Sequence, residues 1–293
     1  MEFIKTLSNN NQLALNTVYQ EKAIERSTGF SFRLVFGGQE HYTSGSRSIT
    51  LYPGHFLWLN EGISYSREIN SSEPVSSFSI EVTREFFGNF IKSVESTTQN
   101  LLDNPFKNDH LAMDLPLTIL PLQGDLKYTV INLKRNLEAG YSDDLLLNTY
   151  LHHYLINYYK IFNAEVISRL ERLDFLQKST RIEILKRLLL AKDFILSNYH
   201  SKLTLEEIAG VACLSKNHLL RSFRQAYNIS PYQFLIRVRL ERARDLLETG
   251  DYQVKDIAAT VGFDCTSSFI SFFKKTYSHT PARYPGGSRL MLS

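Results

Sequence analysis

The last third of the chain contains one sequence pattern twice. The segment Leu205–Ser215 reads LEEIAGVACLS and returns 49 residues later as VKDIAATVGF at 254–263. After one inserted residue, FRQAYNISPYQF at 223–234 returns 50 residues later as FKKTYSHTPARY at 273–284. Two copies are too few for a solenoid, which needs at least about three repeats. We therefore interpret the pattern as one structural unit used twice.

Each copy predicts a short helix, a tight turn and a second helix. In the first copy Thr204 and Glu207 form a capping-box signature, Cys213 takes the turn and Ser215 is the N-cap of the second helix. In the second copy Gly262 takes the turn, where a small residue lets the helices approach. The residues expected to face inward are Leu205, Ile208, Ala209, Leu219 and Phe223, and then Ile257, Ala258, Phe263, Phe269 and Phe273. This arrangement is typical of a helix-turn-helix.

A connecting helix is expected between the two copies. Ser230 is its N-cap, Pro231 its first residue, and Gly250 follows its end. One apolar stripe runs along it: Ile236, Leu240, Ala243 and Leu247. At ~1.5 Å per residue, the 17 residues from Pro231 to Leu247 give a rod of roughly 25 Å. Such a rod can hold two helices near the ~34 Å spacing of successive major-groove faces.

Positive charge is concentrated in the same part of the chain. The net charge is only +3, but from residue 181 to the end Lys and Arg outnumber Asp and Glu by 17 to 10. The first 180 residues have 16 basic and 20 acidic side chains. The excess favours a polyanionic partner for the C-terminal part. Glu206, Glu207 and Asp256 are interpreted as helix-start charges near a positive dipole end, not as catalytic carboxylates.

The segment from Arg181 to Tyr284 resembles the DNA-binding domain of the AraC/XylS family of transcription regulators. The residues that carry the resemblance are LTLEEIAGVACLSKNHLLRSFRQAYNISPYQFLIRVRLERARDLL at 203–247 and VKDIAATVGFDCTSSFISFFKKTYSHTPARY at 254–284. The sequence departs from the common pattern at Cys213, where the turn often has Gly, and at Pro285, where Arg often follows the last Tyr. The resemblance implies double-stranded DNA as the partner.

The resemblance also implies which side chains touch DNA. The expected base contacts are Asn217, Leu220 and Arg221 in the first copy and Thr266, Ser267 and Ser271 in the second. The expected phosphate contacts are Lys216, Arg224, Lys274 and Lys275, although any one of these could be ordinary solvated surface. A guanidinium can bond guanine at two atoms, which is worth about 1–3 kcal/mol of discrimination, whereas short hydroxyls discriminate poorly. We hypothesise that the first copy supplies more of the sequence readout.

Residues 30 to 82 have a different pattern, with short aromatic and β-branched segments separated by turn residues. The expected strands are FSFRLVF (30–36), SITLY (48–52), HFLWLN (55–60), ISYSREI (63–69) and SSFSIEV (76–82), and Thr83 starts a helix. Strands at this spacing predict a small β-barrel or a sandwich. In the context of the family, the arrangement resembles the cupin-like N-terminal sensor barrel.

The expected barrel could hold a metal or a small molecule. Glu40, His41, His55 and Glu61 could meet as metal ligands, but the sequence lacks a His-x-His pair, so we predict no metal and no cofactor. The aromatic side chains Phe32, Phe36, Tyr52, Phe56, Trp58 and Tyr65 are interpreted mainly as core. Some of them at a barrel mouth, together with Arg33 or Arg67, could bind a small effector.

Two amphipathic helices are expected from Asp125 to about Lys178. One face consists of Leu126, Val130, Leu133 and Leu137, and the other of Leu145, Asn148, His152, Leu155 and Tyr159. Ser142 is expected to cap the second helix. The pair resembles the family's dimerisation segment, and the alternative is that both helices simply cover the sheet. Arg169–Lys178 is expected to link the halves, and Thr180 with Glu183 to cap the following helix.

The predicted fold class is therefore α+β. A cupin-like sensor domain is expected at 1–123, a helical dimerisation and linker segment at 124–178, and an all-α domain with two helix-turn-helix motifs at 179–293. The predicted function is sequence-specific transcription regulation by a non-enzymatic cytoplasmic protein. Its candidate partners are DNA, a second copy of the chain, a small effector and RNA polymerase. No apolar stretch approaches the ~20 residues of a membrane span, and no cleavable leader is expected.

Three other functions compete with this prediction. A metal-dependent cupin enzyme with a DNA-binding tail would purify with a near-stoichiometric metal. A DNA-repair methyl acceptor would need an activated cysteine outside the helices, whereas Cys213 and Cys265 both lie within the repeats. A structural helical adaptor would not retain DNA in a salt-dependent way. The sequence does not name the effector, the operator or the direction of regulation.

Overall fold

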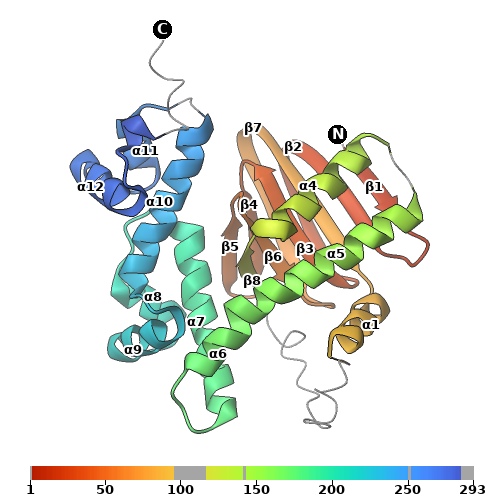
Figure 1. Ribbon diagram of the computed structural model, residues 1–293, viewed down its shortest axis with the longest axis horizontal. Helices are drawn as coiled ribbons and strands as arrows, with labels where there is room; N and C mark the ends of the chain where they lie inside the picture. Colours follow the sequence, from red (N-terminus) through yellow and green to blue (C-terminus); the bar gives the residue numbers. More distant parts are fainter. Residues whose placement is uncertain (1, 96–116, 141–142, 250–251, 285–293) are drawn as a thin grey trace. The chain divides into compact units, whose positions relative to one another are not determined.

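The computed structural model describes residues 2–95, 117–140, 143–249 and 252–284 (Figure 1). The chain divides into two compact units, Met1–Ser168 and Arg169–Ser293. The first unit is a sheet with helices and the second is entirely helical within its described residues, so the α+β class is confirmed. The finer division into segments at 123 and 178 stays a prediction.

The first unit is built on one antiparallel sheet. Its strands are β1 (Glu2–Thr6), β2 (Gln12–Arg26), β3 (Phe30–Gly37), β4 (Glu40–Ser44), β5 (Arg47–Leu51), β6 (His55–Leu59), β7 (Ser64–Val82) and β8 (Thr118–Pro121). The main path runs β1-β2-β7-β3-β6-β8, and β4 pairs with β5 and β7. Closure of this sheet into a cupin-like barrel stays a prediction.

The predicted strands at 30–36, 48–52 and 55–60 are confirmed as β3, β5 and β6. The two strands expected at 63–69 and 76–82 form one long strand, β7, that pairs with β2 along most of its length. Val18 pairs with Val75 and Gln20 with Asn70, so the residues between Asn70 and Val75 bulge opposite a single residue. Strands β1, β2, β4 and β8 were not predicted.

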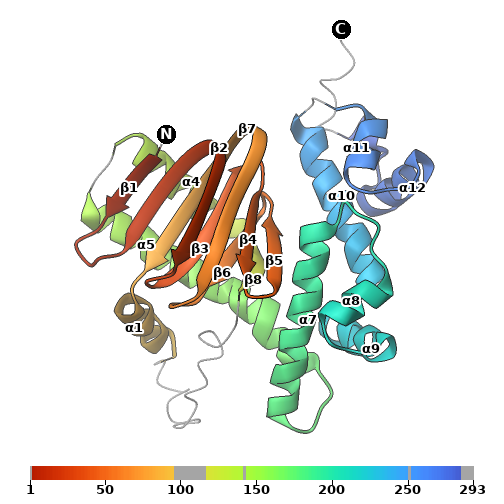
Figure 2. The same ribbon diagram turned by 180° about the vertical axis from the view of Figure 1, so that it is seen from behind.

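Helices cover one face of this sheet. They are α1 (Arg84–Glu95), α4 (Gly124–Glu138) and α5 (Asp144–Phe162), and a π-helical turn (Asn163–Ile167) follows α5. Phe32 packs edge-on against Tyr154 and Tyr158 of α5, with ring centroids 4.7 and 5.1 Å away. Trp58 stacks on Tyr158 at 4.9 Å. Figure 2 shows the sheet from the side away from α5.

The starts of two helices agree only in part with the sequence. Thr83 caps α1 as predicted, because its hydroxyl accepts a hydrogen bond from the Phe86 amide. The cap of α5 is Asp143, whose carboxylate accepts from the amides of Leu145 and Leu146. Ser142, the predicted cap, lies outside the described residues.

The buried faces of α4 and α5 test the predicted stripes. The stripe of Leu126, Val130, Leu133 and Leu137 is confirmed as buried. The stripe predicted on α5 is buried only in part: Leu155 is buried, whereas Leu145 is 77% exposed and His152 is exposed. The face that packs on the sheet is about one residue away, at Leu147, Leu151, Tyr154, Leu155 and Tyr158. Nearly every turn of α5 has apolar residues both on the face that packs on the sheet and on the opposite face. The periodicity of apolar residues alone therefore did not identify the buried face.

The second unit is a helical bundle. Its helices are α6 (Ser168–Arg172), α7 (Lys178–Asn198), α8 (Leu205–Val211), α9 (Lys216–Tyr227), α10 (Pro231–Thr249), α11 (Val254–Thr260) and α12 (Thr266–Tyr277), and a short 3-10 turn spans Pro281–Arg283. The pair α8 and α9 and the pair α11 and α12 lie at opposite ends of α10 (Figure 1). Both copies of the repeat therefore fold as a short helix, a turn and a longer helix.

The core of this unit follows the predicted stripes. The inward residues Ile208, Ala209, Leu219, Phe223, Ile257, Ala258, Phe269 and Phe273 and the α10 stripe of Ile236, Leu240, Ala243 and Leu247 are buried. Leu205 and Phe263 are only half-buried. The capping box of Thr204 and Glu207 and the cap of Ser230 on the Gln233 amide are present. Gly250, expected after α10, lies outside the described residues.

One prediction before this core is corrected. Helix α7 begins at Lys178, and its N-cap Gln177 makes no side-chain cap hydrogen bond, so the capping pair expected at Thr180 and Glu183 is wrong. The charged stretch Arg169–Lys178 packs on α9, and its role as a linker stays a prediction. Within it the Arg169 guanidinium lies 4.6 Å from the Tyr227 ring centroid, and Arg172 donates to the Ala226 carbonyl.

Across the described ranges, no helix has the length and apolar character that a membrane crossing requires.

Candidate nucleic-acid interface

The two turns have matching hydrogen bonds. The Leu214 amide donates to the Ala209 carbonyl at 3.0 Å, and 49 residues later the Phe263 amide donates to the Ala258 carbonyl at 2.9 Å. Cys213 donates to Gly210 in the first turn, and Gly262 makes the corresponding bond in the second. The repeated sequence therefore produces the same backbone path twice.

The turn residues share an unusual backbone conformation. Cys213 has φ +50° and Gly262 has φ +89°, so both lie in the left-handed region. This region favours glycine because it has no Cβ. The glycine expected from the family pattern is thus present in the second turn, as Gly262. In the first turn Cys213 adopts the same left-handed backbone conformation. The Arg187 guanidinium donates to the Cys213 carbonyl at 2.8 Å and holds that turn against α7.

The longer helices also end alike. Asn228 and Ser278 follow α9 and α12 with φ values of +60° and +63°. Their amides donate at 2.9 Å to the carbonyls of Arg224 and Lys274, respectively. These left-handed caps end both helices after 12 residues. Helices α9 and α12 therefore have the same length and the same kind of C-terminal cap, and they lie at the two ends of α10.

The predicted base-contact residues lie on the outer faces of α9 and α12. Asn217 and Arg221 on α9 and Ser267 and Ser271 on α12 are exposed. Leu220 and Thr266 are half-buried. In Figures 1 and 2 α9 and α12 lie on the same side of α10. The two helices can therefore present these side chains to one extended partner.

The predicted phosphate-contact residues are exposed: Lys216 at the start and Arg224 in the last turn of α9, and Lys274 and Lys275 in the last turn of α12. Lys216 pairs with Glu206 of α8, and the hydrogen bond from Lys216 lowers the pKa of that carboxyl group. Bonds from Thr204 lower the pKa of Glu207. Both glutamates therefore act as helix-start charges.

Cys265 is a feature that sequence reasoning did not identify as special. It is the N-cap position of α12, and its thiol lies 3.4 Å from the Ser267 hydroxyl and 3.0 Å from the Ser268 hydroxyl. Hydrogen bonds with Ser267 and Ser268 lower the pKa of the thiol to about 7. Cys265 and Cys213 are both free and exposed.

The candidate metal ligands of the first unit do not converge. Glu40 bonds with Arg67 and Tyr42, His41 with Thr50 and Gln39, and Glu61 with Arg84. Within the described parts of the chain, no three side chains of His, Cys, Asp or Glu are grouped as a metal site.

A family model described as a helix-turn-helix domain matches residues 208–285. This range contains both turns and both longer helices. Residues 208–285 are therefore an AraC-type helix-turn-helix domain.

Curated relatives match the chain over about a third of its length. The Msm operon regulatory protein of Streptococcus mutans is 31% identical over 93 residues, which cover 32% of this chain and 34% of that protein. The bifunctional transcriptional activator and DNA-repair enzyme AdaA of Bacillus subtilis is 33% identical over 101 residues, which cover 34% and 48%. The chain thus spans less than half the length of these relatives.

A similar solved structure carries the family name. It is a probable AraC family transcriptional regulator from Rhodopseudomonas palustris, 23% identical to this chain. The match covers 36% of this chain and 96% of that one, with a TM-score of 0.33.

Proposed function

We propose that the chain is a sequence-specific DNA-binding regulator of transcription and not an enzyme. Two helix-turn-helix motifs in the C-terminal unit read DNA, and the N-terminal unit mediates dimerisation and senses a small molecule. The observation that carries the proposal is the duplication of the whole turn geometry, with exposed polar faces on α9 and α12 at the two ends of α10.

The length of α10 supports two contacts on one duplex. Its 19 residues give a rod of roughly 28 Å. Successive major-groove faces are ~34 Å apart, and the offsets of α9 and α12 from the ends of the rod add to its length. One chain then reads two turns of DNA, with α9 in one groove and α12 in the next.

An exposed apolar surface supports dimerisation. On α5, Leu145 is 77% exposed and Ile156 is 44% exposed, and on α4 Tyr128 is 71% exposed. Large apolar side chains on the outer face of a helix layer are typical of a surface that a partner covers. The exposed part of the stripe expected on α5, which includes Leu145, is therefore part of the proposed interface.

The arginine at the centre of α9 carries the strongest prediction for readout. Replacing Arg221 with alanine should remove about 1–3 kcal/mol of discrimination at one base position, because a guanidinium can bond guanine bidentately. Replacing Ser271 with alanine should weaken binding to every half-site by about the same amount. This amount should be smaller than the loss that Arg221→Ala causes at its base position. Binding to a set of singly mutated half-sites measures both effects.

Lys274→Ala serves as the comparison for a phosphate contact. It should weaken binding uniformly across the half-sites and reduce the salt slope by about 1. A larger loss of specificity from Ser271→Ala than from Arg221→Ala would reverse the proposed roles of the two copies.

A further inference from the structure

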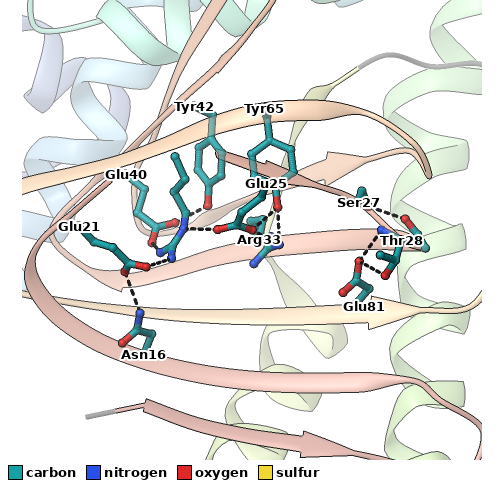
Figure 3. A network of polar contacts seen from close by, with 12 residues as sticks. Asn16, Glu21, Glu25, Ser27, Thr28, Arg33, Glu40, Tyr42, Tyr65 and Glu81 are labelled. Carbon is teal, nitrogen blue, oxygen red and sulfur yellow. Dashed lines mark hydrogen bonds and ion pairs between the residues drawn. The ribbon is translucent and has the colours of Figure 1, made fainter. Parts of the chain in front are cut away.

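The first unit contains a cavity on the face of the sheet that α5 does not cover. Successive side chains of a strand point to opposite faces, so Arg33 points away from the face on which its neighbour Phe32 contacts α5. The cavity has a volume of about 290 Å³, near the lower end of the ~300–1,000 Å³ range of small-molecule sites. Its polar wall includes Arg67 and, as Figure 3 shows, Glu21, Glu25, Arg33, Glu40 and Tyr42.

Arg67 is fully used by the protein itself. Its Nη2 donates to Glu21 at 2.5 Å, its Nε to Glu25 at 3.1 Å and its Nη1 to Glu40 at 3.2 Å. These three glutamates come from β2 and β4, so one guanidinium ties two strands to β7. Tyr42 donates to the second oxygen of Glu40. Each nitrogen of Arg67 is thus already bonded to a glutamate, so Arg67 organises the wall.

Arg33 is used only in part. Its Nη2 donates to Glu25 at 2.9 Å and contacts the Tyr65 hydroxyl, which itself donates to Glu25 at 2.6 Å. The Nε of Arg33 is buried without a partner, whereas Nη1 is not enclosed and also makes no hydrogen bond among the described residues. An oxygen of a molecule in the cavity can therefore accept a hydrogen bond from Nη1.

The carboxylates of the cavity outnumber the guanidinium groups. Glu21, Glu25 and Glu40 face Arg33 and Arg67, and Glu81 also lines the cavity, so the lining has two more negative than positive groups. Burial alone would raise the pKa of Glu25, but Arg33, Tyr65 and Arg67 outweigh burial and lower it.

The carboxylates nearest to solvent can accept more hydrogen bonds. A carboxylate offers about four lone-pair positions. Glu21 accepts from Arg67 on one oxygen and from Asn16, at 2.9 Å, on the other. Its side chain is 30% exposed. An ammonium group in the cavity could bond here without displacing either donor.

We propose that this cavity binds a small organic cation of monosaccharide size, an amine that also carries a hydroxyl or carbonyl oxygen. The ammonium group bonds to Glu21 and compensates the excess negative charge, and the oxygen accepts a hydrogen bond from Nη1 of Arg33. A carboxylate or phosphate ligand is disfavoured because four glutamates line the cavity. The inference rests on the proposed sensing role of the N-terminal unit and names the class of molecule sensed.

Three sugars that share one ring and differ in charge test the proposal. Titration calorimetry on the full chain at low salt compares D-glucosamine, D-glucose and D-glucuronate, with ethanolamine as a smaller amine that also carries a hydroxyl. Glucosamine should bind saturably, glucose at least about tenfold more weakly, and glucuronate not at all. Glucose or glucuronate binding as tightly as glucosamine, or no binding by either amine, would overturn the proposal.

Two matched variants locate the site. Glu21→Gln keeps the shape and the acceptor for Arg67 but removes a charge, so it should weaken glucosamine binding by about tenfold. Glu68→Gln removes a charge from an exposed ion pair with Lys22 outside the cavity and should leave binding unchanged. If Glu21→Gln does not fold, Glu81→Gln replaces it. Unchanged binding in the folded cavity variant would contradict the assignment.

DNA binding by the same preparation separates the two claims. A chain that retains DNA but binds no amine refutes only the cavity assignment. A chain that binds glucosamine but never DNA refutes the proposed function while the cavity assignment stands.

Discussion

Replacing Arg67 with methionine should destabilise the N-terminal unit by about 3–5 kcal/mol. The substitution leaves Glu40, which is 1% exposed, as a buried carboxylate without its cation. It also removes the donor that ties Glu21 and Glu25 to β7. Urea unfolding followed by fluorescence measures this loss, because the chain has one tryptophan, Trp58, and it is buried in this unit.

Two further variants decide whether the unpaired charge is the cause. Arg84→Met breaks an exposed pair with Glu61 and should change stability by no more than about 1 kcal/mol. Adding Glu40→Gln to Arg67→Met should recover much of the lost stability, since the buried charge is then gone. Equal losses from Arg67→Met and Arg84→Met would show that the network contributes little.

Replacing Gly262 with alanine should destabilise the C-terminal unit by about 2–4 kcal/mol. A non-glycine residue in the left-handed region costs about 1–3 kcal/mol. In addition, a Cβ at this position would lie 2.5 Å from the His200 carbonyl oxygen and 2.8 Å from its carbon, and backbone cannot move aside cheaply. Thermal unfolding followed by circular dichroism at 222 nm reports on this helical unit.

Gly210→Ala is the matched control. Gly210 lies near the end of α8 in the first copy, where an added Cβ would meet no atom within 4 Å and the backbone has no positive φ. Alanine is the better helix former, so this variant should be unchanged or stabilised by up to about 1 kcal/mol. If both variants have the wild-type midpoint, the close approach of the second turn to His200 is not a constraint on the fold.

The C-terminal unit could be predicted from sequence because its signals are local. Caps such as Thr204 and Ser230 and the apolar spacing of α9, α10 and α12 each specify structure within a few residues. The duplication then supplied an internal check, since each copy predicted the other. What local signals missed was the start of α7, whose N-cap Gln177 makes no side-chain bond.

The sheet could be predicted only where its strands are apolar. Strands β3 and β6 are buried and aromatic, so they were found. Strand β2 has mostly exposed or half-buried side chains over fifteen residues and carries no apolar alternation. Its pairing with β7 is set by long-range register, which no local pattern encodes.

The cavity was anticipated only by residue type. Arg33 and Arg67 were named as candidates beside aromatic residues, but their partners Glu21 and Glu25 lie on the strand that was missed. Only the pairing of β2 with β7 brings these charges together. The sequence therefore indicated an aromatic pocket with an arginine, and it did not indicate the carboxylates that surround the two guanidinium groups.

Selection of bound fragments from a random duplex pool by the full chain is the decisive experiment for DNA reading by α9 and α12. We expect enrichment of two short elements about 10–10.5 base pairs apart, with affinity that falls steeply as salt rises. Arg221→Ala should erase the information at one position of one element. Recovery of an unenriched pool, or of fragments with a single element whose binding does not depend on α12, would contradict the reading of one duplex by two matched helices.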